Sequence, residues 1–317
     1  MKNYLANRLA PFVVTKIWGG RKLVNMRQLD HKYEGEKVGE TWDISYLSEG
    51  PSLLDGKPLS AYIDETSLPY LVKTIDTSEE LSIQVHPGDE YARKYENSSG
   101  KTECWLILAA GEGAGIYLGF NEGVDASSFF TALERGEDVS KLLRFYPVTG
   151  GEFFFVPAGT IHAIGKNVTL AEIQQSSGIT YRVWDWNRVD DKGQGRELHV
   201  NKARDVLNFS PECNTKGFFK YQENLIGESA SREVRLINHP QFEVSIRKLA
   251  RSESVILEEK DGRALSVVLL DGGGLEYKLC GESGQIDRTG GFLFKDLQGA
   301  TSLELTSRDE AQFIIIR

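Results

Sequence analysis

Cysteine is scarce in this chain, and its scarcity limits the kinds of site that the chain could contain. Three cysteines, Cys104, Cys213 and Cys280, stand far apart among 317 residues. An odd number of widely spaced thiols provides neither a disulfide framework nor a Cys-x-x-Cys metal or redox motif. Because disulfides persist mainly in oxidising compartments, this composition favours a protein of the reducing cytoplasm.

Long hydrophobic runs and excess positive charge are also lacking. The N-terminal stretch MKNYLANRLAPFVV has no signal-peptide core, and no segment reaches transmembrane length. Thirty-seven Lys and Arg against 46 Asp and Glu give a net charge of −9. A nucleic-acid-binding protein would normally carry a basic surface, so we expect neither nucleic acid nor membrane as a partner. An acidic protein can still bind a small anionic substrate in a locally basic pocket.

Short apolar or alternating stretches recur between Gly, Pro, Asp and Asn. Examples are PYLVKTID, ECWLILAA, EFFFVPAG, SVVLLDGGG and AQFIIIR. Strands at this density predict a mainly β protein built of antiparallel sandwiches or barrels. The length exceeds what one core usually supports, so we expect two domains. A polar stretch near residues 210–232 places the boundary between a first domain at 1–232 and a second at 233–317.

Two segments show helical rather than strand periodicity. In DASSFFTALERGEDVSKLLRFYP, apolar residues recur at helical spacing, which predicts a small helical insertion around residues 125–146. Gly136 is expected to divide it in two. The segment HVNKARDVLNF, which ends before Pro211, is a second predicted helix. Both are expected to pack or cover, and not to carry chemistry.

Polar residues share one face of the strand LSIQVHP. Strand side chains alternate with period two, so Ser82, Gln84 and His86 point away from Leu81, Ile83 and Val85. The same rule places Lys101, Glu103 and Trp105 opposite Thr102, Cys104 and Leu106. We therefore interpret Cys104 as a core residue.

His162 begins a strand after the turn in GEFFFVPAGTIHAIG. Together with Gln84, His86 and Glu103 it would offer two nitrogen and two oxygen ligands to a divalent metal. The alternative is ordinary packing, in which Glu103 forms an ion pair with a lysine and each histidine is hydrogen-bonded in the core. We assign His31, His199 and His239 to that ordinary class.

The segment around His162 resembles the second signature of the cupin superfamily, G-x5-P-x-G-x2-H. Gly151, Pro157, Gly159 and His162 are in register with it. The first signature is altered, because its H-x-H becomes Gln84-Val-His86 and its glutamate is delayed by an insertion. The resemblance implies two cupin-type jelly-roll β-sandwich domains. Near the C-terminus the register recurs, with Ser302 where the histidine stood, so the second domain is expected to have no metal site.

The altered signatures are themselves similar to those of the type I mannose-6-phosphate isomerase family in its short bacterial form. The motifs VGETWDIS, LPYLVKTID, LSIQVHP, GKTECW, VPAGTIHAIG and YRVWDWNR occur in this order over about residues 10–210. The combination of QVHP, KTE and GTIHAIG is specific. Such enzymes interconvert mannose 6-phosphate and fructose 6-phosphate through a cis-enediol, so the resemblance implies a phosphosugar substrate and one zinc ion per chain.

The resemblance also assigns roles to individual residues. The implied zinc ligands are Gln84, His86, Glu103 and His162, and the implied catalytic residues are Arg182, Lys101 and Glu172. The implied substrate-binding residues are Lys73 and Ser82, for the phosphate, and Glu40, near the pocket. Arg182 has two possible jobs, gripping the phosphate or stabilising the enediolate. The proton carrier stays open between Glu172, Lys101 and a metal-bound hydroxide.

Two rival functions remain open from the sequence. One is an iron-dependent cupin oxygenase, although such sites usually present three histidines or two histidines and one carboxylate. The other is a non-catalytic sugar-binding cupin. The amide ligand and the basic set Lys73, Lys101 and Arg182 favour a phosphosugar isomerase. We expect a monomer or weak homodimer.

Overall fold

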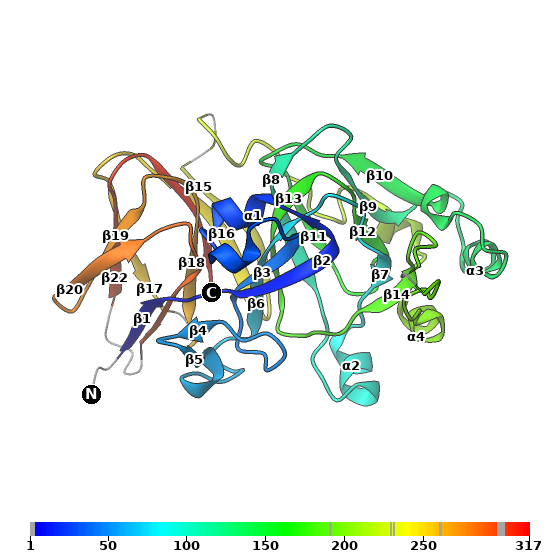
Figure 1. Cartoon of the computed structure of the whole chain (residues 1–317), viewed down its shortest axis with the longest axis horizontal. Helices are drawn as coiled ribbons and strands as arrows, with labels where there is room; N and C mark the ends of the chain where they lie inside the picture. The colour runs from blue at the N-terminus through cyan, green and yellow to red at the C-terminus, as the bar shows by residue number, and fades with distance from the viewer. Residues whose placement is uncertain (1–3, 190–191, 229, 231, 260–261, 297–301) are drawn as a thin grey trace. The chain divides into compact units, whose positions relative to one another are not determined.

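The computed structural model describes residues 4–189, 192–228, 230, 232–259, 262–296 and 302–317. Within them strands predominate and helices are short, which confirms the predicted mainly β fold (Figure 1). None of the described helices is long and apolar enough to cross a membrane. The chain divides into a central unit, residues 18–20 and 76–223, and a terminal unit, residues 1–17, 21–75 and 224–317.

This division differs from the expected boundary at residues 232 and 233, because the N-terminal segments group with the C-terminal strands. Strand β1 (Tyr4–Arg8) pairs antiparallel with β21 (Phe292–Asp296). The amide of Leu9 donates to the carbonyl of Gly291 at 2.8 Å. Pairing between opposite ends of the chain leaves no local pattern in the sequence. A self-contained second domain at 233–317 stays a prediction.

The terminal unit contains most of the strands. Besides β1 and β21 they are β2 (Phe12–Gly20, whose last three residues belong to the central unit), β3 (Val38–Ile44), β4 (Leu53–Leu54), β5 (Lys57–Pro58), β6 (Tyr70–Asp76, whose last residue belongs to the central unit), β15 (Glu233–His239), β16 (Phe242–Leu249), β17 (Ser254–Glu258), β18 (Leu265–Gly272), β19 (Leu275–Leu279), β20 (Glu282–Ile286), β22 (Ser302–Ser307) and β23 (Ala311–Ile316). Its helical segments are α1 (Lys22–Met26) and two 3-10 turns, η1 (His31–Tyr33) and η2 (Leu59–Ala61).

Two sheets of the terminal unit enclose an apolar core. Their strand orders are β1-β21-β18-β23-β16-β15 and β17-β22-β19-β20. Phe292, Phe294, Phe313, Leu265 and Leu305 all lie in this core with almost no exposure. Each such side chain contributes about 1.5–3 kcal/mol by leaving water. The absence of a metal site from the second domain stays a prediction. Leu297 and Gly299 of the repeated cupin register lie outside the described residues.

The central unit is the smaller sandwich. Its strands are β7 (Ile83–Val85), β8 (Glu103–Ala110), β9 (Gly115–Phe120), β10 (Leu143–Pro147), β11 (Phe153–Val156), β12 (His162–Ile164), β13 (Val168–Gln175) and β14 (Tyr181–Trp184). Its helices are α2 (Asp89–Tyr95), α3 (Ala126–Glu134) and α4 (Val200–Val206), with 3-10 turns η3 (Val139–Leu142) and η4 (Pro211–Asn214). One sheet has the order β10-β9-β12-β7-β14, and β11, β8 and β13 are neighbours in the other.

The predicted helical insertion is only partly helical. Asp125 caps α3 through a capping box with Ser128, and Gly136 ends this segment with a φ of +69°. Residues 139–142 form a 3-10 turn, but residues 143–147 are strand β10 and not helix. Residues 143–147 alternate between buried and exposed and pair with β9. The helical spacing of the apolar residues before them therefore does not continue into this segment. The second predicted helix is confirmed as α4.

Candidate metal and substrate site

Three neighbouring strands present one row of polar side chains. His162 on β12 lies opposite Gln84 on β7, and Gln84 lies opposite Arg182 on β14. Residues paired directly across strands project from the same face of a sheet. The alternating residues Ile83 and Val85 enter an apolar cluster on the other side. The row His162–Gln84–Arg182 therefore lines one face, as strand alternation predicts for Gln84.

A tight turn fixes the strand ends that carry the two histidines. Pro87 follows His86 after β7, and the amide of Gly159 donates to the carbonyl of His86 at 2.8 Å. Gly159 has a φ of +85°, and a Cβ there would lie 2.9 Å from the carbonyl oxygen of Val206. Only glycine meets both conditions without strain. The Pro-x-Gly turn thus brings the loop before His162 against His86, the residue that directly follows β7.

The opposing sheet contributes a carboxylate to the same space. On β8, Glu103 and Trp105 lie opposite Gln174 and Glu172 of β13, so these four side chains share a face. Cys104 points the other way and is buried, as alternation predicts. Burial raises the pKa of the Cys104 thiol well above its usual value.

Side chains from the two sheets of the central unit converge on one buried point. His86 Nε2 lies 3.4 Å from Glu103 Oε2, and His162 Nε2 lies 3.5 Å from Glu103 Oε1. All three side chains are at most 1% exposed. Among the described residues they form a group whose ligand atoms lie within 4.8 Å of one another. The structure thus brings together three of the four residues that the resemblance implies as metal ligands.

Both histidines are oriented by backbone carbonyls. His86 Nδ1 lies 2.9 Å from the carbonyl oxygen of Ile179, and His162 Nδ1 lies 2.9 Å from that of Thr160. These bonds place the proton on Nδ1 and leave the Nε2 lone pair facing Glu103, the arrangement typical of metal-binding histidines. Burial, followed by the charge of Lys101, lowers the pKa of His86 to about 3. Burial also lowers the pKa of His162.

Glu103 is buried as a carboxylate. Burial acts to raise its pKa, but the ammonium of Lys101 and the neighbouring His86 hold the pKa well below its usual value. Lys101 Nζ lies 2.9 Å from Glu103 Oε2 and 2.9 Å from His86 Nε2. Neither carboxylate oxygen accepts a hydrogen bond of regular geometry among the described residues. The Lys101 ammonium offsets this buried charge, and both carboxylate oxygens keep acceptor capacity that suits a metal ion.

The donor set fits a divalent metal. Ligand bonds of about 2.1 Å in a tetrahedral site separate the ligand atoms by about 3.4 Å, close to the two nitrogen–oxygen separations here. Two neutral imidazoles and one carboxylate are donors that zinc and iron both accept. Gln84 completes the implied set by position, but its amide nitrogen lies 3.2 Å from His162 Nε2. Its oxygen would face the cation only after the amide group turns over.

Arg182 is held by a neighbouring loop that the sequence analysis left outside the site. The Arg182 amide donates to His199 Nδ1 at 3.1 Å, and the His199 amide donates to the Arg182 carbonyl at 2.7 Å. Arg182 Nη1 donates to the carbonyl of Glu197 at 2.8 Å, whereas its buried Nε has no hydrogen-bond partner among the described residues. Burial lowers the pKa of Arg182. No sequence motif marked His199 for this role.

The residues predicted to bind substrate fall into different parts of the chain. Ser82 is buried just before β7 in the central unit. Lys73 and Glu40 belong to the terminal unit, where Lys73 Nζ lies 3.4 Å from Glu40 Oε2. Lys73 Nζ also lies 4.6 Å from the ring centre of Trp42, whose Nε1 donates to Glu40 at 2.8 Å. Lys73 and Glu40 therefore form an ion pair, and both side chains contact Trp42.

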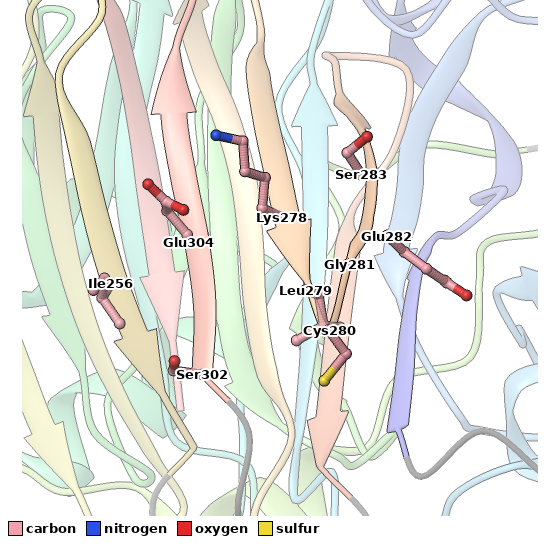
Figure 2. Close-up of a pocket in the computed structure, with 9 residues that line it drawn as sticks. All are labelled: Ile256, Lys278, Leu279, Cys280, Gly281, Glu282, Ser283, Ser302 and Glu304. Carbon is pink, nitrogen blue, oxygen red and sulfur yellow. The ribbon is translucent and has the colours of Figure 1, made fainter.

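A separate hollow lies on the four-stranded sheet of the terminal unit (Figure 2). Ile256, Glu304 and Lys278 stand in register on adjacent strands along its floor. Its lining includes the exposed thiol of Cys280. Among its described lining residues there is no histidine, and the carboxylates are those of Glu282 and Glu304, so it does not resemble the site around Glu103.

Comparisons with known proteins give the family. No family model matches the chain. The mannose-6-phosphate isomerase of Streptococcus mutans is 39% identical over 214 residues, which cover 63% of this chain and 66% of that protein. A probable mannose-6-phosphate isomerase of Bacillus subtilis is 37% identical over 215 residues, covering 63% of this chain and 67% of that protein. These matches thus span about two thirds of the relatives' own length.

Solved structures extend the likeness to the whole fold. The crystal structure of the mannose 6-phosphate isomerase from Bacillus subtilis matches 98% of this chain and 99% of its own, with a TM-score of 0.79 and 27% identity. The apo enzyme from Salmonella typhimurium, at 14% identity and a TM-score of 0.72, shares the fold. The comparisons confirm the predicted family and cupin-type fold, and support neither rival. This chain belongs to the mannose-6-phosphate isomerase family of enzymes.

Proposed function

We propose that this protein interconverts mannose 6-phosphate and fructose 6-phosphate. The observation that carries the proposal is the buried group His86, Glu103 and His162, in a chain of this family. Both imidazoles turn an unprotonated Nε2 toward the carboxylate. Lys101 contacts this group, and Arg182 stands in the same cross-strand row as His162, next to Gln84. These two cations suit an anionic sugar better than a neutral one.

The metal that we assign to the site is zinc, one ion per chain. Zinc accepts imidazole, carboxylate and amide ligands together, and Gln84 would supply the amide oxygen after its side chain turns over. When bound, the cation would polarise the sugar carbonyl and stabilise negative charge on its oxygens, which would make the C2–H bond more acidic. Glu103 offsets only part of a charge of two, which leaves the site electropositive.

Glu172 is the group that we assign to carry the proton. In the forward direction its carboxylate takes the proton from C2, the C–H electron pair becomes the C1–C2 double bond, and the π pair of C1=O1 moves onto O1, which gives the cis-enediol framework. The same carboxyl group then returns the proton to C1, while a hydroxyl proton passes from O2 to O1. Trp105 Nε1 donates to Glu172 Oε2 at 3.1 Å and fixes its direction. A single carboxylate suffices because both carbons present the same face.

Two cations are assigned to the substrate's charges. Lys101 lies between His86 and Glu103, so its ammonium is placed to stabilise negative charge on the enediol oxygens. Arg182 projects from the same face as Gln84 and His162, and its guanidinium provides a bidentate partner for either the enediol oxygens or the phosphate. Lys73, Ser82 and Glu40 stay assigned to substrate binding as predictions.

A coupled assay that reports fructose 6-phosphate tests the function. We expect turnover with mannose 6-phosphate as isolated, loss of at least a hundredfold after chelation, and recovery when zinc is added back. Oxygen consumption should be absent, and removal of oxygen should leave the rate unchanged. Failure of the metal-replete protein to turn over, together with saturable sugar binding, would instead establish the binding protein; oxygen-dependent product would establish the oxygenase.

The cellular setting and oligomeric state complete the proposal. We place the protein in the cytoplasm as a monomer or weak homodimer, which sedimentation over a range of concentrations can test. No disulfide joins its three cysteines, in keeping with a reducing compartment. A stable higher oligomer in sedimentation would contradict this part of the proposal.

A further inference from the structure

Three successive backbone amides around Lys101 are held by two other parts of the chain, residues 87–89 and the end of β13. The Gly100 amide donates to Asp89 Oδ1 at 2.8 Å. The Lys101 amide donates to the carbonyl of Pro87 at 3.0 Å. The Thr102 amide donates to Gln175 Oε1 at 2.8 Å. The segment carrying Lys101 belongs to no helix or strand, yet each of its amide protons is accounted for.

The side chains of Asp89 and Gln175, which accept two of these three bonds, are hydrogen-bonded to each other. Gln175 Nε2 donates to Asp89 Oδ1 at 3.0 Å. The backbone amide of Gln175 also donates to the carbonyl of Thr102 at 3.0 Å. Thr102 is therefore held through both its backbone N–H and its carbonyl. We call Asp89 and Gln175 together the backbone clamp. Because its two members grip the residues on either side of Lys101, neither the position nor the direction of that residue is free.

Close packing at Gly100 tightens the clamp. A Cβ there would lie 2.5 Å from the amide nitrogen of Asp89 and 2.7 Å from the carbonyl carbon of Gly88. The chain before Lys101 is thus pressed against the start of α2, and glycine is the residue that this approach permits. The approach also places Asp89 Oδ1 between its two hydrogen-bond donors.

We propose that Asp89 and Gln175 are positioning residues for Lys101, an inference that rests on the proposed function. The clamp fixes the backbone from which a flexible four-carbon side chain must reach Glu103 Oε2 and His86 Nε2, both 2.9 Å from Nζ. It also ties Lys101 to the ligand segment, since Pro87 and Asp89 follow His86 in the chain. Lys101 is therefore fixed relative to the ligands, so the separation between its ammonium and the reacting oxygens stays constant.

Asp89→Ala removes one side of the clamp without touching Lys101. We expect kcat to fall about tenfold to thirtyfold with KM within twofold, because the ammonium acts on charge that develops in the transition state. Asp89→Asn keeps an acceptor oxygen and should restore kcat to within about threefold of wild type. Asp125→Ala, which deletes another aspartate that bonds a backbone amide, should leave kcat unchanged.

The decisive measurement is a double-mutant cycle with Lys101→Met. A residue that acts through Lys101 has nothing left to position in that background, so adding Asp89→Ala should change kcat by less than about twofold. A full further loss of tenfold or more would show that Asp89 acts only on the fold and would overturn the proposal. Gln175→Ala provides a second cycle, with the same expectation, if Asp89→Ala proves too unstable to purify.

Zinc affinity provides a readout that needs no isomerase activity. An ammonium beside the ligands repels a divalent cation, so Lys101→Met should tighten zinc binding in competition with a chromophoric chelator. Asp89→Ala should tighten it by about threefold to tenfold in wild type and not at all in the Lys101→Met background. Equal shifts in both backgrounds would overturn the clamp. If wild type binds zinc but does not isomerise mannose 6-phosphate, the proposed function fails while this comparison still decides the clamp.

Discussion

Trp105 and Glu172 face each other across β8 and β13 and share a hydrogen bond from the indole Nε1 to Glu172 Oε2 at 3.1 Å. The Trp105 ring also meets the His162 ring edge to face, with centroids 5.4 Å apart. One aromatic side chain therefore contacts both the assigned proton carrier and an assigned metal ligand. The hydrogen bond from Trp105 therefore fixes the orientation of the Glu172 carboxylate.

Glu172→Gln should separate the geometry of this carboxylate from its chemistry. The amide oxygen of glutamine can still accept the bond from Trp105, but the amide cannot accept a proton from carbon. We therefore expect kcat to fall by at least about a hundredfold, with zinc content and KM within threefold of wild type. Steady-state kinetics and metal analysis measure both. A variant that kept a tenth of wild-type kcat would transfer the role of proton carrier to Lys101 or to metal-bound hydroxide.

His162→Ala tests the metal site itself. Removing one imidazole leaves Glu103 buried with fewer partners, so stoichiometric zinc should be lost and turnover should fall below detection. Metal content after dialysis against trace zinc measures the first effect, and the coupled assay measures the second. His239→Ala, in the terminal unit, is the matched control and should change neither. Retention of both metal and turnover by His162→Ala would eliminate this ligand set.

Strand periodicity carried most of what could be predicted about the site. Period-two alternation is a local property, so it correctly separated Glu103 from Cys104 and Gln84 from its apolar neighbours. It gave no sign of His199, whose contact with Arg182 depends on a loop closing back onto β14. It also gave no sign of the amide orientation of Gln84, which hydrogen bonding across strands decides.

Elements without an apolar stripe escaped prediction. The sequence of helix α2, DEYARKY, is mostly charged, and Ala92 is its buried residue. A stretch of this composition is more readily interpreted as a charged loop than as a helix. Its acidic first turn and basic last turn suit the helix dipole, but that signal is weak beside missing periodicity. The grouping of residues 21–75 with the C-terminal strands was likewise beyond local pattern, since it depends on contacts such as that of Tyr70 with Ser266.

Arg182→Ala should reduce catalysis without affecting the metal. A guanidinium that binds the enediol oxygens or the phosphate contributes transition-state stabilisation of more than about 1.4 kcal/mol, so kcat/KM should fall by more than about tenfold. A rise in KM with kcat unchanged would assign Arg182 to the phosphate. A fall in kcat with KM unchanged would assign it to the enediol. Arg204→Ala, a half-exposed arginine on α4, is the control. A change smaller than tenfold would remove Arg182 from the catalytic set.

The terminal unit contains a buried ion pair whose loss should be costly. Arg27 Nη2 lies 2.6 Å from Asp43 Oδ2, and the two side chains are 1% and 0% exposed. Thr74 Oγ1 and Thr41 Oγ1 donate to the two carboxylate oxygens at 2.6 and 2.9 Å. Asp43→Ala would leave the guanidinium buried without its counter-charge, so we expect the free energy of unfolding to fall by about 3–5 kcal/mol.

Urea denaturation at neutral pH measures this change, and Glu276→Ala is the matched control. Glu276 pairs with Arg308 at 2.9 Å, but both side chains are more than 40% exposed, so its loss should cost no more than about 1 kcal/mol. The contrast follows from solvation, because water replaces the lost partner at the surface and cannot do so around Arg27. Equal destabilisation by the two substitutions would show that Arg27 finds another partner or reaches solvent when Asp43 is removed.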